Sequence, residues 1–285
     1  MAFSSTTLTL KDGRSLEYLL SGPADGPVVL LANPLCATLE SWDHVVPAIH
    51  GKGLRVLRFN QPGHGSSSAP KALDTTFPSI ADDVHQLLTY LGLKTVHAWI
   101  GVSMGAATSF FFVTRFPGVV DTLIICDTIA SSPGNAGQED LFGPRVAAAR
   151  EAGSLETTVK QSMQRWFGDD WLAANPDEAE RMRTLMGRTT VDGFATCCNA
   201  LTSDTFDIRP LYRKVGAAVE KALLIVGEKD ANLPQTMAVM RDEIEGGFRD
   251  AGKQDAVELK VLKDTGHVCY VDGLEQFKGE VLAFL

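Results

Sequence analysis

Long apolar runs and clusters of basic residues are both missing from this chain of 285 residues, and each absence excludes a class of function. No apolar run approaches the roughly 18 residues that a membrane-spanning helix needs, so a membrane partner is not expected. The net charge is −9 and no group of lysines and arginines stands out, so nucleic acid is not expected either. Residues 1–7 lack the basic start and the apolar stretch of a signal peptide, which favours a cytoplasmic location.

Cysteine is also sparse, with five residues that are scattered along the chain. They show none of the spacings typical of metal ligands, so no metal site is predicted. Reduced thiols in a cytosolic protein are the simpler interpretation. The five residues are Cys36, Cys126, Cys197, Cys198 and Cys269.

What the chain does contain is an alternation of strand and helix patterns. A hairpin around Asp12-Gly13 comes first. Apolar runs typical of buried strands follow at 27–32, 54–59, 95–100, 120–126, 222–226 and 257–262. Helical patterns lie at 41–49, 80–91, 106–116 and 233–245, and a last one begins at Leu274. This alternation predicts an α/β protein whose mainly parallel sheet is covered on both faces.

The alternation is interrupted between Ser131 and Pro210. Residues 131–137 are predicted to form a loop, and the rest of the segment has helical patterns and no strand pattern. We therefore expect one α/β core formed by residues 1–130 and 211–285, with residues 131–210 inserted as a helical lid.

The pentapeptide Gly101-Val102-Ser103-Met104-Gly105 lies where a predicted strand passes into a predicted helix. A serine between glycines at such a turn is the G-x-S-x-G nucleophile elbow. The flanking residues must be small, because the turn is strained and the helix and the strand approach closely. The pattern therefore predicts that Ser103 is a nucleophile whose hydroxyl stands above the edge of the sheet.

A serine hydroxyl needs a neighbouring base to take its proton. Of the six histidines, His267 is the best placed, because it follows the predicted strand 257–262 and lies at the same end of the sheet as Ser103. His64 also follows a predicted strand, in Asn60-Gln-Pro-Gly-His-Gly65, but its flanking glycines favour a role in a turn. His267 is therefore the predicted base.

The base needs a carboxylate that fixes its tautomer and stabilises the imidazolium. Asp230 follows the predicted strand 222–226, which gives the chain order Ser, Asp, His of this architecture. Asp127 is the alternative acid, because it follows the predicted strand 120–126. We favour Asp230 and otherwise expect Asp127 to form hydrogen bonds at the end of its strand.

A tetrahedral intermediate also needs two N–H donors for its oxyanion. The Met104 amide, directly after the nucleophile, is one candidate. The other is expected from Asn33-Pro34-Leu35-Cys36, after the first parallel strand. Pro34 has no N–H, so the Leu35 amide is the predicted donor.

These motifs resemble the α/β-hydrolase superfamily over nearly the whole chain, and within it the 3-oxoadipate enol-lactonases. The resemblance implies the α/β-hydrolase fold, with a mostly parallel eight-stranded sheet, helices on both faces and a helical lid. It also implies hydrolysis of a small-molecule ester or lactone through a Ser-His-Asp triad and an acyl-enzyme, without metal or organic cofactor. Four stretches carry the enol-lactonase resemblance: Asn33–Trp42, Cys126–Ala130, Arg165–Phe167 and Asp192–Leu201.

Three departures from the family pattern bear on the substrate. Asn60 replaces a frequent aspartate, Pro62 replaces the usual arginine before Gly-His-Gly, and the base loop continues as Gly266-His-Val-Cys-Tyr270. The enol-lactone of a dicarboxylic acid would require a cation for its free carboxylate. The candidates in the expected lid are Arg145, Arg165 and Arg188, and Trp166 is a candidate for the pocket wall.

Two alternatives remain open at this point. The same triad would serve another carboxylesterase, a polyketide or mycotoxin lactonase, or a carbon–carbon bond hydrolase. A ligand-binding receptor on the same fold would not need catalysis at all. The presence of Ser103, His267 and Asp230 together argues against the receptor, because a receptor can lose any of them.

Overall fold

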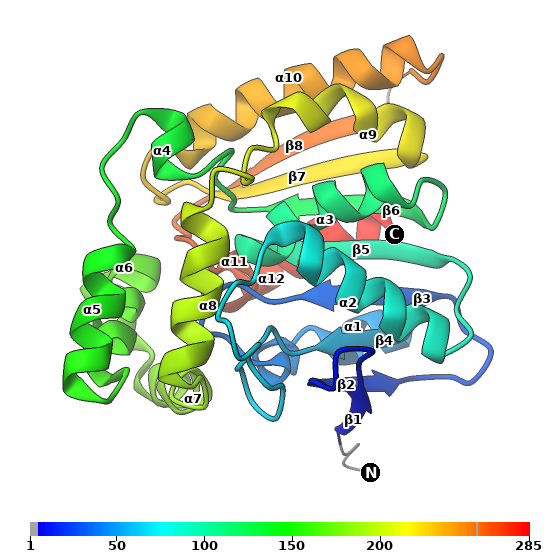
Figure 1. Ribbon diagram of the computed structural model, residues 1–285. Helices are drawn as coiled ribbons and strands as arrows, with labels where there is room; N and C mark the ends of the chain where they lie inside the picture. Colours follow the sequence, from blue (N-terminus) through cyan, green and yellow to red (C-terminus); the bar gives the residue numbers. More distant parts are fainter. Residues whose placement is uncertain (1–4, 255) are drawn as a thin grey trace.

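The centre of the protein is an eight-stranded sheet in the order β1-β2-β4-β3-β5-β6-β7-β8 (Figure 1). The computed structural model describes residues 5–254 and 256–285. The pairs β1–β2 and β2–β4 are antiparallel, and every other neighbouring pair is parallel. The strands are β1 (Thr6–Thr9), β2 (Ser15–Ser21), β3 (Val28–Ala32), β4 (Arg55–Phe59), β5 (Val96–Val102), β6 (Val120–Cys126), β7 (Lys221–Gly227) and β8 (Val257–Leu262).

The four central parallel strands, β3, β5, β6 and β7, are buried along almost their whole length. Their apolar residues are continuous rather than alternating, because both faces of a parallel sheet must be covered. Figure 1 shows one face covered by α2 and α3 together with α9 and α10, while α1 and α12 lie on the other. These helices are α1 (Val46–Gly51), α2 (Phe77–Tyr90), α3 (Met104–Arg115), α9 (Tyr212–Ala218), α10 (Leu233–Asp250) and α12 (Leu274–Phe284).

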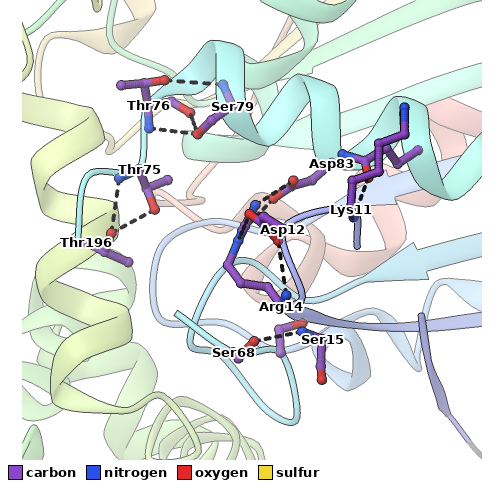
Figure 2. Close-up of polar contacts among 12 residues, drawn as sticks. Lys11, Asp12, Arg14, Ser15, Ser68, Thr75, Thr76, Ser79, Asp83 and Thr196 are labelled. Atoms are coloured by element: carbon purple, nitrogen blue, oxygen red, sulfur yellow. Dashed lines mark hydrogen bonds and ion pairs between the residues drawn. The ribbon is translucent and has the colours of Figure 1, made fainter. Parts of the chain in front are cut away.

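The predicted hairpin around Asp12-Gly13 is present, and ion pairs attach it to α2. Gly13 has a positive φ of 86°, which suits glycine in the tight turn between β1 and β2. The guanidinium of Arg14 donates to both carboxylate oxygens of Asp83 at 2.7 and 2.8 Å (Figure 2). Residues Thr76 and Ser79 form a capping box at the start of α2, which explains where this helix begins.

Two expected elements differ from the structure. The helix predicted at 41–49 is divided into a short 3₁₀ helix, η1 (Leu39–Trp42), and α1, because Pro47 favours the first turn of a helix over its interior. The expected loop 131–137 contains one helical turn, α4 (Pro133–Ala136). The Ser132 hydroxyl accepts from the Asn135 amide at 3.3 Å, and Gly137 ends the turn at a φ of 66°.

Between β6 and β7 the described chain adds helices and no further strand to the sheet. Four of them, which we call the inserted helices, lie together beyond one end of the sheet (Figure 1). They are α5 (Gly143–Ala152), α6 (Glu156–Ala174), α7 (Pro176–Met186) and α8 (Val191–Thr202). The short helices η2 (Arg209–Leu211) and α11 (Cys269–Asp272) complete the described elements. Along residues 5–254 and 256–285, no helix combines the length and the apolar character that crossing a membrane requires.

Candidate active site

Loops from the carboxyl ends of β3, β5, β7 and β8 carry the predicted triad and the two predicted oxyanion donors. Because these strands are parallel, their carboxyl ends lie at one edge of the sheet. Ser103 follows β5 directly, while Asp230 and His267 lie in the loops after β7 and β8. Leu35 lies in the loop after β3, the strand next to β5.

Ser103 occupies a strained turn between β5 and α3. Its φ of 53° and ψ of −114° lie outside the regions that L-residues normally adopt. A Cβ on Gly101 would lie 2.5 Å from the carbonyl carbon of Gly105, and a Cβ on Gly105 would lie 2.2 Å from the carbonyl oxygen of Ala32. Both glycines are therefore required by close backbone approach, which confirms the packing expected of the elbow.

His267 and Asp230 are in direct contact. The Nδ1 atom of His267 lies 2.6 Å from Oδ2 of Asp230, and both side chains are buried. This contact assigns the Nδ1–H tautomer and leaves Nε2 as the free nitrogen. Burial lowers the pKa of His267, the neighbouring Asp230 opposes that shift, and Arg165 adds to it. The imidazole is therefore neutral and basic at Nε2 near pH 7.

The Ser103 hydroxyl forms no side-chain hydrogen bond with any residue in the described ranges 5–254 and 256–285. Its backbone is nevertheless fixed, because its amide donates to the Cys126 carbonyl at 2.8 Å and its own carbonyl accepts from the Thr128 hydroxyl at 3.0 Å. Contacts between a nucleophile and its base often tighten only when substrate binds. The hydroxyl is therefore free to turn toward a base or a substrate.

Asp127 is fully buried at the end of β6 and makes a different contact. Its Oδ1 accepts from the Gly227 amide at 2.8 Å, at the end of β7. Its Oδ2 has no hydrogen-bond partner among the described residues. Burial and the nearby charge of Asp230 raise the pKa of Asp127 well above its usual range. The side chain thus holds β7 at the point where the chain turns toward Asp230.

Two backbone amides are free beside the elbow. Within the described ranges, neither the Leu35 amide nor the Met104 amide donates to another residue. The Cys36 amide is occupied, because it donates to Nε2 of His64 at 2.9 Å. Met104 also begins α3, so its amide lies at the positive end of the helix dipole. This arrangement leaves two donors available for an anion.

Trp166 links the inserted helices to His267. Its carbonyl accepts from the His267 amide at 3.0 Å, and the two rings lie 5.9 Å apart between centroids. The indole is buried, and its Nε1 has no acceptor among the described residues. Trp166 therefore forms part of the surroundings of His267, as a pocket wall would.

The three arginines of the predicted lid have different surroundings. Arg145 donates to the Ser162 hydroxyl at 2.6 Å and lies over the Phe194 ring. Arg165 is exposed to solvent, yet desolvation by surrounding protein atoms lowers its pKa, and Asp230 is among its charged neighbours. Arg188 instead pairs with Glu40.

Some contacts of this site could not be anticipated from the sequence. Asp272 accepts from the Gly266 amide at 2.6 Å and so holds the loop before His267. Thr189 donates to the Cys36 carbonyl at 3.3 Å. The first contact joins residues six positions apart and the second joins distant segments, but both use backbone atoms, for which no side-chain pattern gives a signal. Only the Gly266 residue hints at a close approach, and a Cβ there would lie 1.9 Å from the Trp166 carbonyl oxygen.

Comparison with known proteins agrees with the fold. A family model described as the alpha/beta hydrolase fold matches residues 27–274. The 3-oxoadipate enol-lactonase 2 of Acinetobacter baylyi is 28% identical over 79% of this chain and 79% of its own length. The solved enol-lactonase from Burkholderia xenovorans has a TM-score of 0.84 at 26% identity, covering 98% of this chain and 99% of its own. A solved hydrolase from Pseudomonas aeruginosa has a TM-score of 0.83 at 27% identity, covering 100% and 99%. The chain therefore belongs to the α/β hydrolase family.

Proposed function

We propose that the protein hydrolyses a carboxylic ester bond, most specifically that of a lactone similar to 3-oxoadipate enol-lactone. Ser103 is the nucleophile, His267 the general base and Asp230 the acid that orients the base. The observation that carries the proposal is the 2.6 Å contact between His267 and Asp230 at the sheet edge that also bears the strained Ser103 turn. The similarity to enol-lactonases supports the choice of a lactone.

The first half-reaction opens the ring. The Ser103 oxygen attacks the ring carbonyl carbon while Nε2 of His267 takes the hydroxyl proton, and Asp230 stabilises the resulting imidazolium. The carbonyl oxygen becomes an oxyanion, to which the Leu35 and Met104 amides donate. His267 then protonates the ring oxygen as its bond to the carbonyl carbon breaks, which leaves an acyl group on Ser103.

The second half-reaction releases the acid. Water loses a proton to Nε2 of His267 and attacks the acyl carbon, and the same two amides stabilise the second oxyanion. His267 returns the proton to the Ser103 oxygen as the ester breaks. For an enol-lactone, the hydroxyl released in the first step is an enol, which tautomerises to a ketone.

The inserted helices have a defined place in this proposal. We assign residues 131–210 as a lid over the core formed by residues 1–130 and 211–285. The charge of Arg165 interacts with that of Asp230, and Arg145 lies on the neighbouring helix α5. Either guanidinium would attract the free carboxylate of an enol-lactone. Trp166 would form the apolar wall beside the ring.

The test is hydrolysis of 3-oxoadipate enol-lactone by the purified protein, followed by ultraviolet absorbance. Uncharged γ-lactones, p-nitrophenyl acetate and a β-diketone serve as comparison substrates. We expect the charged enol-lactone to have the highest kcat/KM, and Arg165→Gln to raise its KM without a similar effect on the uncharged lactones. Preferred cleavage of the β-diketone, or no ester hydrolysis at all, would contradict the proposal.

A further inference from the structure

Cys36 is held at both of its backbone polar groups. Its amide donates to Nε2 of His64 at 2.9 Å, and its carbonyl accepts from the Thr189 hydroxyl at 3.3 Å. The residue is buried and has a φ of 67°, a conformation that non-glycine residues seldom adopt. We call His64, Thr189 and Cys36 the Cys36 clamp.

The tautomer of His64 follows from its two partners. The Pro62 carbonyl can only accept, so Nδ1 of His64 donates to it at 3.0 Å. The Cys36 amide can only donate, so Nε2 is the acceptor. The imidazole is therefore neutral, and burial lowers its pKa to about 4. A fully buried ring with both nitrogens engaged has one fixed orientation.

The Cys36 clamp leaves one amide of the loop without a partner, so that this amide is available to donate to an oxyanion. Cys36 directs its amide at His64, whereas the Leu35 amide, one residue earlier, has no partner in the described chain. A rotation of the Leu35–Cys36 peptide would turn the Cys36 amide away from His64 and shift the backbone that carries the Leu35 amide. Because the left-handed backbone of Cys36 is strained, surrounding contacts must hold it in place.

Thr189 brings the inserted helices into this arrangement. It lies between α7 and α8 and forms an antiparallel bridge with His64. On either side of it, the Gly65 amide donates to the Arg188 carbonyl at 3.2 Å and the Thr190 amide donates to the Gly63 carbonyl at 3.0 Å. The same short segment therefore contacts both the loop that carries His64 and the loop that carries Leu35.

We propose that His64 and Thr189 are positioning residues that hold the Leu35 amide in the oxyanion hole, so that docking of the inserted helices and stabilisation of the oxyanion are coupled. This inference rests on the proposed function. Neither side chain touches the substrate. Each acts through the peptide groups of Cys36.

The experiment compares p-nitrophenyl acetate with its thionoester, in which sulfur replaces the carbonyl oxygen. Sulfur is a weak hydrogen-bond acceptor, so a functional oxyanion hole favours the oxygen ester. The ratio of the two kcat/KM values thus reports on the hole and is insensitive to a general loss of folded enzyme. The variants are His64→Leu, which removes the acceptor, His64→Gln, which restores one, and Thr189→Val.

The matched control is Thr196→Val. Thr196 is a buried threonine of α8 that also links the inserted helices to the core, through Thr75 (Figure 2). Among the described residues, its side chain hydrogen-bonds with Thr75 and with no residue of the Cys36 loop. We expect His64→Leu and Thr189→Val to lower the oxygen-to-sulfur ratio by roughly tenfold, less than the 100- to 1,000-fold cost of deleting an oxyanion donor. His64→Gln should recover most of the ratio, and Thr196→Val should leave it unchanged.

Two outcomes would overturn the proposal that His64 and Thr189 position the Leu35 amide. One is an unchanged ratio in Thr189→Val and in the folded His64 variants, while a fluorophosphonate still labels Ser103 of the natural protein. The other is an equal fall in Thr196→Val, which would indicate general loosening. If His64→Leu does not fold, Thr189→Val decides the matter alone. A natural protein that neither hydrolyses the ester nor takes the label would contradict the proposed function itself, and the clamp with it.

Discussion

Two buried aspartates, Asp127 and Asp230, follow neighbouring strands and have different surroundings. Asp230 contacts the imidazole of His267, whereas Asp127 accepts from a backbone amide and its pKa is raised by burial and by the charge of Asp230. A carboxylate that orients a base must be ionised, while a protonated acid can serve as a structural hydrogen-bonding group. Their environments thus assign the two residues different tasks.

Replacement of each aspartate by asparagine separates these tasks. Asp230→Asn should lower kcat by about 10⁴, because the amide favours the wrong tautomer of His267. Asp127→Asn should retain most of the activity, because its amide oxygen can still accept from Gly227. Steady-state kinetics on p-nitrophenyl acetate measure both, and circular dichroism confirms folding. The reverse ranking would make Asp127 the acid.

The charge of Arg165 should be visible in the pH dependence of kcat/KM. Activity needs neutral His267 and is lost as pH falls through the pKa of that residue. Burial and Arg165 both lower this pKa, so the loss should occur below the ordinary value of about 6.5. Arg165→Gln removes one of the contributions that lower this pKa, so the acid limb of the pH profile should move to higher pH.

Arg188→Gln, which removes an ion pair with Glu40, is the control and should not move the acid limb. An uncharged ester must be used, and an unmoved limb in Arg165→Gln would contradict the electrostatic account.

Ser103, His267 and Asp230 could be proposed from the sequence because each follows a recognisable strand and the chain order is informative. The sequence alone does not explain why Asn60 stands where the family frequently has an aspartate. In the structure its Nδ2 donates to the buried carboxylate of Glu17 at 2.7 Å. An aspartate there would face that carboxylate, so the residue depends on a partner from the distant strand β2.

At the scale of elements, the inserted helices meet the core through backbone contacts. One close approach is at Gly63 and Gly193, where a Cβ on Gly193 would lie 2.3 Å from the Gly63 carbonyl oxygen. The contact joins the start of α8 to the loop that carries His64. Small residues at both positions therefore set how deeply α8 docks.

Gly193→Ala should destabilise the protein despite its better helix propensity. The added methyl group must displace the backbone of Gly63, and overpacking of this kind typically costs about 1–3 kcal/mol. Gly279→Ala is the matched control, because that glycine of α12 has open space around its Cβ position and should gain up to about 1 kcal/mol. Urea unfolding measures both. Equal stability of the two variants would contradict the close approach.

The sequence predicts the elements better than their contacts. The central strands were recognisable because continuous apolar runs identify buried parallel strands. The division of 41–49 into η1 and α1 depends on Pro47, which favours the first turn of a helix. The helical pattern of the whole stretch gave no sign of this break. The link between Trp166 and His267 uses a carbonyl and an amide, and any residue type could supply these atoms.

At the scale of the whole molecule, two buried titratable groups change the free energy of unfolding in opposite directions as the pH changes. Burial lowers the pKa of His64 to about 4 and raises the pKa of Asp272 to about 7. The histidine binds its proton more readily in the unfolded chain, so its contribution to stability is lost as pH falls from about 6.5 to about 4. The raised pKa of Asp272 means that its contribution is lost as pH rises from about 3.8 to about 7.

His64→Gln isolates the histidine contribution. Between pH 7 and pH 4 the natural protein should lose up to roughly 3 kcal/mol more unfolding free energy than the variant, because glutamine does not titrate. Urea unfolding at both pH values measures this difference, and the opposing carboxylates cancel because both proteins contain them. Parallel pH profiles would show that His64 does not titrate with folding.

The central claim is that Ser103 attacks the substrate with the help of His267 and Asp230. The most direct measurement is labelling with a fluorophosphonate, located by mass spectrometry of the digested protein, together with the ester hydrolysis rate of Ser103→Ala. The account predicts a single phosphonylated residue, Ser103, and a loss of about a million-fold in kcat for the variant, as in comparable triads. Label on another residue, or a variant that keeps more than a few per cent of the activity, would contradict it.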